Sequence, residues 1–441
     1  MRLRFVVLSF AACVHAIACG SQIISSTPDA TDYDGGPDAS IADASVDAIV
    51  DSSTDSGTID ARPETGTDAA KDAALDAPVA IDSGDASKPD ASDSSAPVIH
   101  ILARIATRTW TTCAVTSTGG VACWGGNTEG QVGDGLKVDR KSPYVVTGLT
   151  GVAEVATGAL HSCALLSGGT IRCWGRNLNG ELGDGTSTAR LAPVEVYGIS
   201  NARTVAAAET HTCAVLASGV VQCWGLNDDG ELGDGTTGKR LTPVSVAGIS
   251  TAVEVTVGEK FSCALLATGD IKCWGNNNPG HLGRGFDSNR ELTPGKVLMN
   301  ERAVKIAGNA YHTCALLETG GVKCWGGSSA SNSSTPQSAT GISTAVDLSA
   351  GTQHICATLS SGIVRCWGVN TDGQIGDGTT NTAKTPTDAQ GVGYQLVFAA
   401  GKHSCAKKTA GDLWCWGGNS FGQLGIGTTT SSSNPVSVTI P

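Results

Sequence analysis

The fold is decided by the stretch Cys263-Ala264-Leu265-Leu266-Ala267-Thr268-Gly269-Asp270-Ile271-Lys272-Cys273-Trp274-Gly275, whose pattern occurs seven times in this 441-residue chain. In every copy a Cys is followed by nine residues and then by Cys-Trp-Gly. The first cysteines of successive copies lie 50, 50, 50, 51, 42 and 49 residues apart. A period of this length indicates a repeat architecture. The pairs are Cys113 and Cys123, Cys163 and Cys173, Cys213 and Cys223, Cys263 and Cys273, Cys314 and Cys324, Cys356 and Cys366, and Cys405 and Cys415.

Each copy contains four short strand patterns. In the fourth copy, residues 251–258 alternate apolar and polar side chains and end at a glycine. Residues 262–266 and 271–274 follow as two strands joined by a glycine-containing turn, and residues 294–298 supply a fourth apolar run. Four antiparallel strands make one blade, so the chain is predicted to be all-β, with a seven-bladed β-propeller over residues 98–441.

The ends of a propeller chain must meet to remove the open edge of the ring. Residues 96–99 (Ala-Pro-Val-Ile) resemble the Ala-Pro-Val of residues 192–194, which belongs to a fourth-type strand. The chain also finishes with such a strand, at residues 435–438. We expect one of these two segments to complete a blade shared by both ends, and the sequence leaves the choice open.

The two cysteines of each copy are predicted to form a disulfide. Cys263 and Cys273 are symmetric about Thr268, so a tight hairpin places them opposite each other, within disulfide range. The alternative is a metal site, because five copies read His-x-Cys, at His161, His211, His312, His354 and His403. Thr111 and Phe261 replace this His in the other two copies, although the Cys pairs remain. In an exported chain disulfides are favoured, and we expect no metal or cofactor.

A glycine-rich loop follows each Cys-Trp-Gly, with the pattern G-x-N-x-x-G-x-[LI]-G-D-G-T in four copies, counting near matches, as in residues 225–236. Gly and Asn at fixed positions favour a structural turn. A phosphate-binding loop would require a Lys and a following helix, and neither is present. A cation at the Asp-Gly-Thr end is the less favoured alternative. The repeated His is expected to make a structural hydrogen bond, and the seven Trp are expected in blade cores.

The first 18 residues are predicted to be a signal peptide. A basic start precedes an apolar run too short to span a bilayer, and Ala16-Ile17-Ala18 is a small-residue cleavage site. Ala16-Ile17-Ala18-Cys19 also resembles the lipobox of bacterial lipoproteins. Cys19 is the one cysteine left after cleavage that has no repeat partner, and lipidation accounts for it. The alternative is a secreted protein with a free thiol at Cys19.

Residues 19–97 are predicted to form a disordered acidic tether rich in Asp, Ala and Ser. Residues 20–97 hold 17 acidic side chains against three basic ones, with too little apolar surface to offset the entropy of ordering. A low-affinity Ca²⁺ buffer is the alternative, but no EF-hand spacing supports a defined site. Residues 98–441 hold 24 acidic and 24 basic side chains. A neutral domain behind an acidic tether disfavours a nucleic-acid partner.

The repeat resembles the regulator-of-chromosome-condensation family, whose blades carry G-x-x-H-[ST]-x-A-L and then G-x-[LV]-x-x-W-G-x-N-x-x-G-Q-L-G. Residues 158–165 and 173–183 match these motifs, and the match recurs seven times across residues 98–441. The resemblance implies a seven-bladed propeller. Its eukaryotic members act as guanine-nucleotide exchange factors on a small nuclear GTPase and bind chromatin. Its bacterial branch includes secreted propellers that inhibit β-lactamases, and no residue of that inhibitory surface is matched here.

Positions that differ between copies are the candidates for function, because the repeated ones build the scaffold. The residue before the His position varies most informatively: it is Trp110, Leu160, Thr210, Lys260, Tyr311, Gln353 and Lys402. These residues should ring one face and suit a binding surface, although drift of surface turns is the alternative. Trp110 and Trp414 are expected to be exposed. The fifth copy lacks the full loop at residues 326–339, which predicts a notch.

We therefore expect a lipid-anchored or secreted protein of the bacterial cell envelope, or an extracellular one, whose propeller binds a protein or a glycan. No motif for catalysis, such as G-x-S-x-G or H-E-x-x-H, is present. The alternative is an envelope hydrolase or lyase with carboxylates or His at the mouth of the channel. A guanine-nucleotide exchange factor is the least favoured function, and the N-terminal lipid would be the one membrane attachment.

Overall fold

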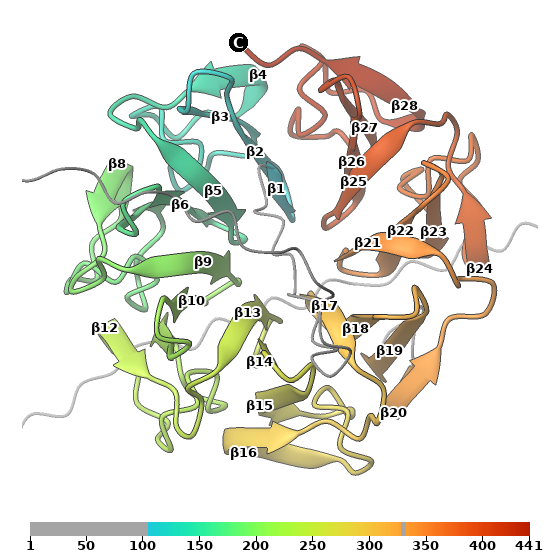
Figure 1. The fold of residues 1–441 in the computed structure, drawn as a ribbon. Coiled ribbons are helices and arrows are strands. Elements are labelled where there is room, and N and C mark those ends of the chain that lie inside the picture. Colours follow the sequence, from blue (N-terminus) through green and yellow to red (C-terminus); the bar gives the residue numbers. More distant parts are fainter. Residues whose placement is uncertain (1–104, 328–331) are drawn as a thin grey trace, which may run out of the picture. The chain divides into compact units, whose positions relative to one another are not determined.

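The computed structural model describes residues 105–327 and 332–441, which form seven four-stranded sheets arranged as blades around a central channel (Figure 1). Within each sheet the strands follow chain order and neighbouring strands are antiparallel. The predicted all-β, seven-bladed propeller is thereby confirmed. The predicted signal peptide, Cys19, the tether and residues 96–99 lie outside the described residues. Within the described part, no helix is long and apolar enough to cross a membrane.

The first four blades take up the first half of the described chain. Blade 1 contains β1 (Ile105–Arg108), β2 (Thr111–Val115), β3 (Val121–Gly125) and β4 (Arg140–Val145). Blade 2 contains β5 (Val152–Thr157), β6 (His161–Leu166), β7 (Ile171–Gly175) and β8 (Arg190–Glu195). Blade 3 contains β9 (Ala202–Ala207), β10 (His211–Leu216), β11 (Val221–Gly225) and β12 (Arg240–Ser245). Blade 4 contains β13 (Ala252–Val257), β14 (Phe261–Leu266), β15 (Ile271–Asn277) and β16 (Ser288–Lys296).

The remaining three blades complete the ring. Blade 5 contains β17 (Ala303–Gly308), β18 (His312–Leu317), β19 (Val322–Gly327) and β20 (Asn332–Ser338). Blade 6 contains β21 (Ala345–Ala350), β22 (His354–Leu359), β23 (Val364–Gly368) and β24 (Ala383–Asp388). Blade 7 contains β25 (Tyr394–Ala399), β26 (His403–Lys408), β27 (Leu413–Gly417) and β28 (Ser432–Val438). The first strand of each blade lines the channel, and the fourth lies at the outer rim (Figure 1).

All seven predicted cysteine pairs are disulfide-bonded, so the prediction is confirmed for each of the fourteen repeat cysteines. The bonds join Cys113 to Cys123, Cys163 to Cys173, Cys213 to Cys223, Cys263 to Cys273, Cys314 to Cys324, Cys356 to Cys366, and Cys405 to Cys415. Each bond links the second and third strands of one blade, where the two residues face each other in the antiparallel register, as Cys163 and Cys173 do. The hairpin between those two turns at Gly169, whose φ of 85° favours glycine. The disulfides are therefore a local consequence of the hairpin.

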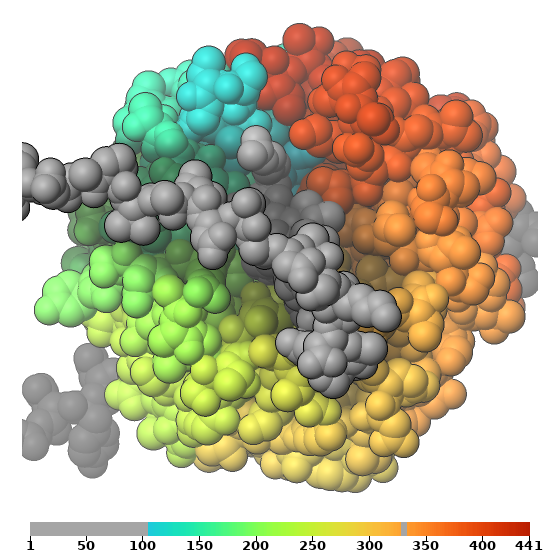
Figure 2. Space-filling model, viewed as in Figure 1, coloured from blue at the N-terminus to red at the C-terminus, as the bar shows by residue number. Residues whose placement is uncertain are grey.

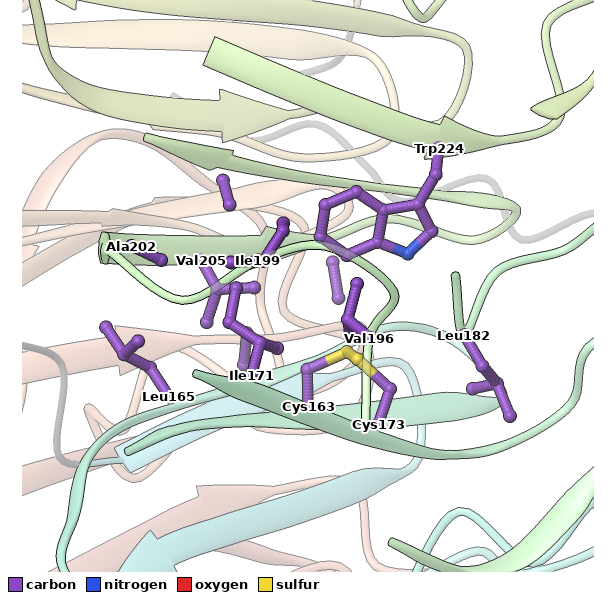
Figure 3. Close-up of a cluster of buried hydrophobic side chains, with 13 residues drawn as sticks. Cys163, Leu165, Ile171, Cys173, Leu182, Val196, Ile199, Ala202, Val205 and Trp224 are labelled. Carbon is purple, nitrogen blue, oxygen red and sulfur yellow. A yellow bond between two sulfur atoms is a disulfide. The ribbon is translucent and has the colours of Figure 1, made fainter. Parts of the chain in front are cut away.

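The hydrophobic core lies between blades. The disulfide Cys163–Cys173 of blade 2 packs in one cluster with Trp224 of blade 3 (Figure 3). The same arrangement occurs at every junction around the ring. The tryptophans are buried as expected, but the prediction that they fill blade cores is wrong. Each indole joins its own blade to the preceding one, because strand side chains project from the faces of a sheet, where the neighbouring blade packs.

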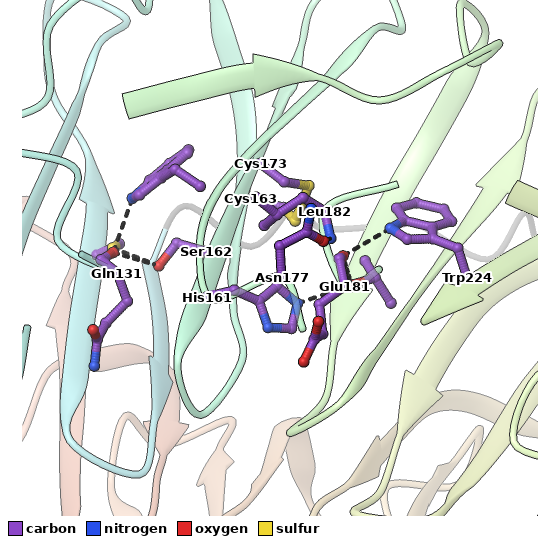
Figure 4. The surroundings of a disulfide bond; sticks show 12 residues. Gln131, His161, Ser162, Cys163, Cys173, Asn177, Glu181, Leu182 and Trp224 are labelled. Carbon is purple, nitrogen blue, oxygen red and sulfur yellow. Dashed lines mark hydrogen bonds between the residues drawn. A yellow bond between two sulfur atoms is a disulfide. The ribbon is translucent and has the colours of Figure 1, made fainter. Parts of the chain in front are cut away.

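A chain of hydrogen bonds accompanies this packing between blades 2 and 3 (Figure 4). Thr212 Oγ1 and Trp224 Nε1 donate to the carbonyl oxygen of Glu181 at 2.9 and 2.8 Å. His161 Nε2 lies 2.8 Å from Thr212 Oγ1. Because Thr212 donates its one hydroxyl hydrogen to the Glu181 carbonyl, the hydroxyl oxygen must accept the hydrogen bond from His161 Nε2. We call this set of four residues the junction relay.

The junction relay recurs at three more junctions. Its members there are His211, Ser262, Glu231 and Trp274; His354, Ser404, Gln374 and Trp416; and His403, Thr112, Gln423 and Trp124. The carbonyl always comes from the glycine-rich loop of the preceding blade. Four of the five repeated histidines therefore make the structural hydrogen bond expected from the sequence, and they make it to the next blade.

The last of these relays also closes the ring. Blade 7 is completed by β28 from the C-terminal end, while blade 1 has its own fourth strand, β4. The expectation of a blade shared by both ends is therefore wrong. The ring closes through side chains of blade 1 that bind the glycine-rich loop of blade 7. Thr112 Oγ1 donates to the carbonyl oxygen of Gln423 at 3.0 Å, and Trp124 Nε1 donates to the same oxygen at 2.9 Å.

Candidate functional site

The seven varying positions lie in or beside the turns between the first and second strands of the blades. Because every blade repeats the same strand order around one ring, these turns lie at the same end of the channel. We call this end the turn face. Four of the side chains are exposed and three are half-buried: the exposed ones are Lys260, Tyr311, Gln353 and Lys402, and the half-buried ones are Trp110, Leu160 and Thr210.

Three of these side chains contact the glycine-rich loop of the preceding blade. The contacts are Trp110 with Phe421 (ring centroids 5.1 Å apart), Lys260 Nζ with the Asp229 carboxylate (3.6 Å) and Lys402 Nζ with the Asp372 carboxylate (3.5 Å). The two ion pairs are solvent-exposed, and such pairs contribute little to stability. The aromatic pair therefore serves blade packing, whereas the two lysines remain accessible on the turn face.

Acidic side chains lie beside the exposed tyrosine of blade 5. Tyr311 is 40% exposed, and the Glu259 carboxylate raises the pKa of its hydroxyl, with burial and the Glu209 carboxylate as further causes. Sequence reasoning missed both glutamates. The signal was available, because Glu209 and Glu259 come directly before the varying positions Thr210 and Lys260. The turn face thus combines lysine, tyrosine and carboxylate groups around the channel mouth.

Arg108 crosses the channel near the turn face. Its guanidinium is buried and crosses from blade 1 to blades 3 and 4, where it donates to the carbonyl oxygens of Ala207 (2.9 Å), Val257 (3.2 Å) and Gly258 (3.3 Å). Burial lowers the pKa of Arg108 to about 10, so the side chain is charged at neutral pH. Sequence reasoning also missed this residue, although most copies have Gly or Ala at its position.

Three carboxylates lie deeper in the channel, on the first strands of blades 2, 4 and 6. Each accepts a hydrogen bond from a backbone N–H on the first strand of the next blade: Glu154 from Val205 (3.3 Å), Glu254 from Ile306 (3.0 Å) and Asp347 from Val397 (2.8 Å). These N–H groups lie on the inner edges of the blades. The carboxylates therefore bond backbone N–H groups that have no further strand beside them to pair with.

Burial sets the protonation of this channel cluster. It raises the pKa of Glu154 to about 8 and that of Glu254 to about 7. Burial also disfavours the charged form of Lys305, but the carboxylates of Asp347 and Glu254 outweigh it and raise the pKa of that ammonium. Lys305 forms an ion pair with Asp347. The cluster thus holds carboxylates whose charge changes near neutral pH.

The enzyme alternative requires carboxylates at the channel, and they are present. The channel contains an open cavity of about 200 Å³, lined mainly by Ala, Val and Thr, which is smaller than the ~300–1,000 Å³ of typical small-molecule sites. In the described part of the chain, no group of three or more His, Cys, Asp or Glu side chains is arranged to hold a metal ion. The three carboxylates named above already accept backbone hydrogen bonds.

The repeat cysteines serve the scaffold and take no part in the turn face. They are buried in the clusters between blades, as Cys123 is beside Trp174, Cys366 beside Trp416 and Cys415 beside Trp124. Their disulfides, Cys113–Cys123, Cys356–Cys366 and Cys405–Cys415, leave no thiolate to act as a nucleophile or metal ligand. The alternative of a His-x-Cys metal site is therefore wrong, because the sulfur atoms that it needs are bonded to each other.

The Asp-Gly-Thr end of the glycine-rich loop serves the loop itself. In blade 2 the Asp184 carboxylate accepts hydrogen bonds from Asn177 Nδ2 (3.1 Å), the Thr186 N–H (2.9 Å) and Arg190 Nε (3.0 Å). Asn177 Oδ1 in turn accepts the N–H of Leu182 at 2.9 Å. The structural turn predicted from the glycines and asparagine matches these contacts, and they occupy the carboxylate that a cation would need.

The expectation for exposed aromatics holds only in part. Trp110 and Trp414 are half-buried, and the Lys408 ammonium lies 4.5 Å from the Trp414 ring centroid. More exposed aromatic rings belong to Tyr197 (70%) and Phe286 (44%). Part of the loop expected to form a notch, residues 328–331, lies outside the described residues.

The fold and its repeats define the class of protein as a seven-bladed β-propeller with one disulfide bond in each blade. Two models of the regulator of chromosome condensation (RCC1) repeat match the chain, one at residues 118–165, 169–215, 218–265, 269–316 and 410–441, the other at residues 152–181, 203–231, 252–280, 303–332 and 345–374. The chain therefore belongs to the RCC1-repeat family. None of the curated proteins matches it in sequence.

Solved structures share the fold at low sequence identity. Human WBSCR16 matches with a TM-score of 0.66 and 18% identity, over 73% of this chain and 94% of that one. Yeast RCC1 (Prp20), solved bound to Kap60, matches with a TM-score of 0.66 and 20% identity, over 78% of this chain and 86% of that one. Prp20p from Saccharomyces cerevisiae matches with a TM-score of 0.64 and 20% identity, over 74% of this chain and 87% of that one.

Proposed function

We propose that this protein is an exported, non-catalytic binding module that presents the turn face of its propeller to a protein partner. One observation carries the proposal: a single repeated backbone holds seven turn side chains of six types at one end, and four of them are exposed. Tyr311 supplies an aromatic anchor of the kind that dominates protein interfaces. Lys260 and Lys402 add charge around it.

The likeness to Prp20 supports a protein as the partner. That propeller was solved bound to Kap60, and its binding to Gsp1p and histones has been described. At 20% identity the likeness extends to the fold alone, so those partners are not carried over. A glycan is the alternative partner. Nucleic acid is disfavoured by the balanced charge of residues 98–441, which hold 24 acidic and 24 basic side chains.

The state of the channel supports a non-catalytic role. Arg108 crosses the channel and bonds three carbonyl groups there, and the cavity of about 200 Å³ is small for a substrate. Glu154 and Glu254, which would be the acid–base candidates of an envelope hydrolase or lyase, already bind backbone groups. A turnover activity lost in Glu154→Gln would contradict this part of the proposal.

The disulfides support export. All seven are almost completely buried, and structural disulfides of this kind persist in oxidising compartments. We place the protein in the bacterial cell envelope as a lipoprotein of the outer membrane or cell surface, with free secretion as the alternative.

The lipid attachment can be tested at Cys19. Cells that express the protein are grown with a labelled fatty acid, and we expect label in the wild-type chain and none in Cys19→Ser. The wild-type protein should fractionate with membranes, whereas Cys19→Ser should be released as a soluble exported protein. An unlabelled wild-type chain would favour the secreted form.

The binding face can be tested with matched baits. Oxidised mature protein is used to capture partners from solubilised envelope and secreted proteins, beside a variant with Lys260, Tyr311, Gln353 and Lys402 replaced by Ala. We expect at least about a tenfold loss of capture, since a few anchors carry most interface energy. A control carries Tyr197→Ala, Leu298→Ala and Val392→Ala, which are exposed side chains between the fourth strand of one blade and the first strand of the next, at the opposite end of the channel. Equal capture by both variants would remove the turn face from the proposal, and binding on a glycan array alone would indicate the glycan alternative.

A further inference from the structure

Blade 5 differs from the other blades at the junction that joins it to blade 4. Phe261 stands where the junction relay has His, so the hydroxyl of Thr313 receives no histidine N–H. His281 stands where the loop elsewhere has Gln or Glu, and its ring stacks on Phe261 with centroids 5.2 Å apart. Within the described residues, Trp325 Nε1 and both ring nitrogens of His281 are buried without a hydrogen-bond partner.

The junction between blade 5 and blade 6 is interrupted as well. His312 is present in blade 5, but Ile355 replaces the Ser or Thr that should accept its hydrogen bond. His312 is completely buried, and neither ring nitrogen has a partner among the described residues. In the complete relays only Nδ1 is left without one. Two successive substitutions, Phe261 and Ile355, therefore interrupt the relay on both sides of one blade.

No other blade has this combination in the described part of the chain. The junction of blades 1 and 2 also lacks the His, because Thr111 replaces it. There, however, Ser162 Oγ and Trp174 Nε1 still donate to the carbonyl oxygen of Gln131, both at 2.8 Å. Buried polar groups without partners disfavour the closed state, because they regain hydrogen bonds with water when the structure opens.

The disulfides provide a second, independent sign. Thirteen of the fourteen repeat cysteines have no exposed surface, whereas Cys324 of blade 5 is 4% exposed. Phe261 and Ile355 are themselves buried, so apolar packing is kept at both junctions. Apolar side chains offer no hydrogen-bond partner to the ring nitrogens of His312, His281 and Trp325. Both junctions of blade 5 therefore keep buried polar groups without hydrogen bonds.

We propose that blade 5 is the least firmly held blade of the ring, that it opens locally before the others, and that Cys314–Cys324 is therefore the disulfide that a thiol reductant reaches first. The reductant, a dithiol, is oxidised to its cyclic disulfide while Cys314 and Cys324 become thiols. Blade 5 also carries Tyr311, so such an opening would alter the turn face. This last consequence rests on the proposed function, whereas the order of reduction does not.

The order of reduction is measured on the oxidised mature protein under native conditions. The protein is incubated with dilute dithiothreitol, quenched with iodoacetamide at intervals and digested, and the alkylated cysteines are quantified by mass spectrometry. We expect Cys314 and Cys324 to be alkylated about tenfold faster than the other pairs, since local opening depends on the hydrogen bonds lost at each junction. Equal rates for all seven pairs, or faster reduction of another blade, would overturn the proposal.

Two variants separate the hydrogen bond from the change in volume. Ile355→Thr restores the hydroxyl that His312 lacks, and Ile355→Val removes similar volume without adding a hydroxyl. We expect slower reduction of Cys314–Cys324 in Ile355→Thr than in Ile355→Val. Thr212→Val makes the reverse change at the intact junction of blades 2 and 3, and it should speed reduction of Cys163–Cys173 and Cys213–Cys223. If Thr and Val behave alike at position 355, the orphaned histidine is not the cause and the proposal fails.

Discussion

A chain whose repeat cysteines are kept reduced should not fold into the propeller. Each disulfide closes a loop with a sequence separation of 10, and such a loop contributes somewhat under about 3 kcal/mol in the entropic model. Seven of them amount to roughly 15–20 kcal/mol. Since whole domains are stable by only about 5–15 kcal/mol, loss of all seven bonds exceeds the expected stability.

The measurement is refolding from denaturant with and without a reductant, followed by near-ultraviolet circular dichroism of the buried tryptophans. We expect the native signal only under oxidising conditions. A double variant, Cys213→Ala with Cys223→Ala, serves as the control because it removes a single bond. It should still fold and lose about 2–3 kcal/mol. A reduced chain with the native signal and melting temperature would show that blade packing alone holds the ring together.

The second large effect is a loss of stability in mild acid. Between pH 7 and pH 5 we expect the free energy of unfolding to fall by about 5 kcal/mol and the melting temperature by about 5–10 °C. The cause is the set of buried histidines, whose pKa values burial lowers to about 3 for His161, His211, His354 and His403 and to about 4 for His281 and His312.

The sign follows from the difference between folded and unfolded chains. An unfolded histidine has a pKa of about 6.5, so below that pH the unfolded chain binds protons that the folded chain rejects. Each histidine therefore contributes fully above pH 6.5 and loses about 1.4 kcal/mol per pH unit below it, down to its folded pKa. Six histidines act in the same direction.

Three buried carboxylates oppose this trend. Burial raises the pKa of Glu154 to about 8 and those of Glu231 and Glu254 to about 7. Their contribution is full below the unfolded pKa of about 4.5 and is lost as the pH rises through 7 to 8. They offset roughly half of the histidine effect between pH 7 and pH 5, so maximal stability is expected near pH 6.5–7.

Single substitutions test this account. His354→Gln removes one titrating group, so the melting temperature should depend less steeply on pH between 7 and 5. Glu231→Gln removes an opposing group and should make the dependence steeper, while it raises stability at pH 8. Gln already occupies the equivalent positions 131, 374 and 423. A melting temperature unchanged between pH 7 and pH 5, or unaffected slopes in both variants, would contradict the account.

The disulfides and strands could be predicted because their causes are local. Cys163 and Cys173 are ten residues apart and symmetric about a turn, so the hairpin alone brings them together. The glycine-rich loop was predictable for the same reason, since Asn177 and Asp184 lie seven residues apart and bond within one turn. The seven varying positions were also found as a set, because comparison of copies needs no structure.

The remaining features depend on contacts between blades. Trp224 was expected to be buried, but its partner, the Glu181 carbonyl, lies 43 residues away. Arg108 contacts carbonyls 99 to 150 residues distant, and no local pattern indicates such a reach. The sequence also left open which of the seven varying residues are exposed. Trp110, for example, is partly covered by Phe421, which lies near the other end of the chain.

The sequence by itself determined the number of blades, the order of strands within them and the pairing of the fourteen repeat cysteines. Those features follow from spacing within about 50 residues, where chain geometry leaves few alternatives. The tertiary structure decided how the ring closes, that each tryptophan joins two blades, that Arg108 crosses the channel, and which junctions lack their relay. These depend on side chains meeting across blades, and such contacts exist only once the ring has brought distant segments together.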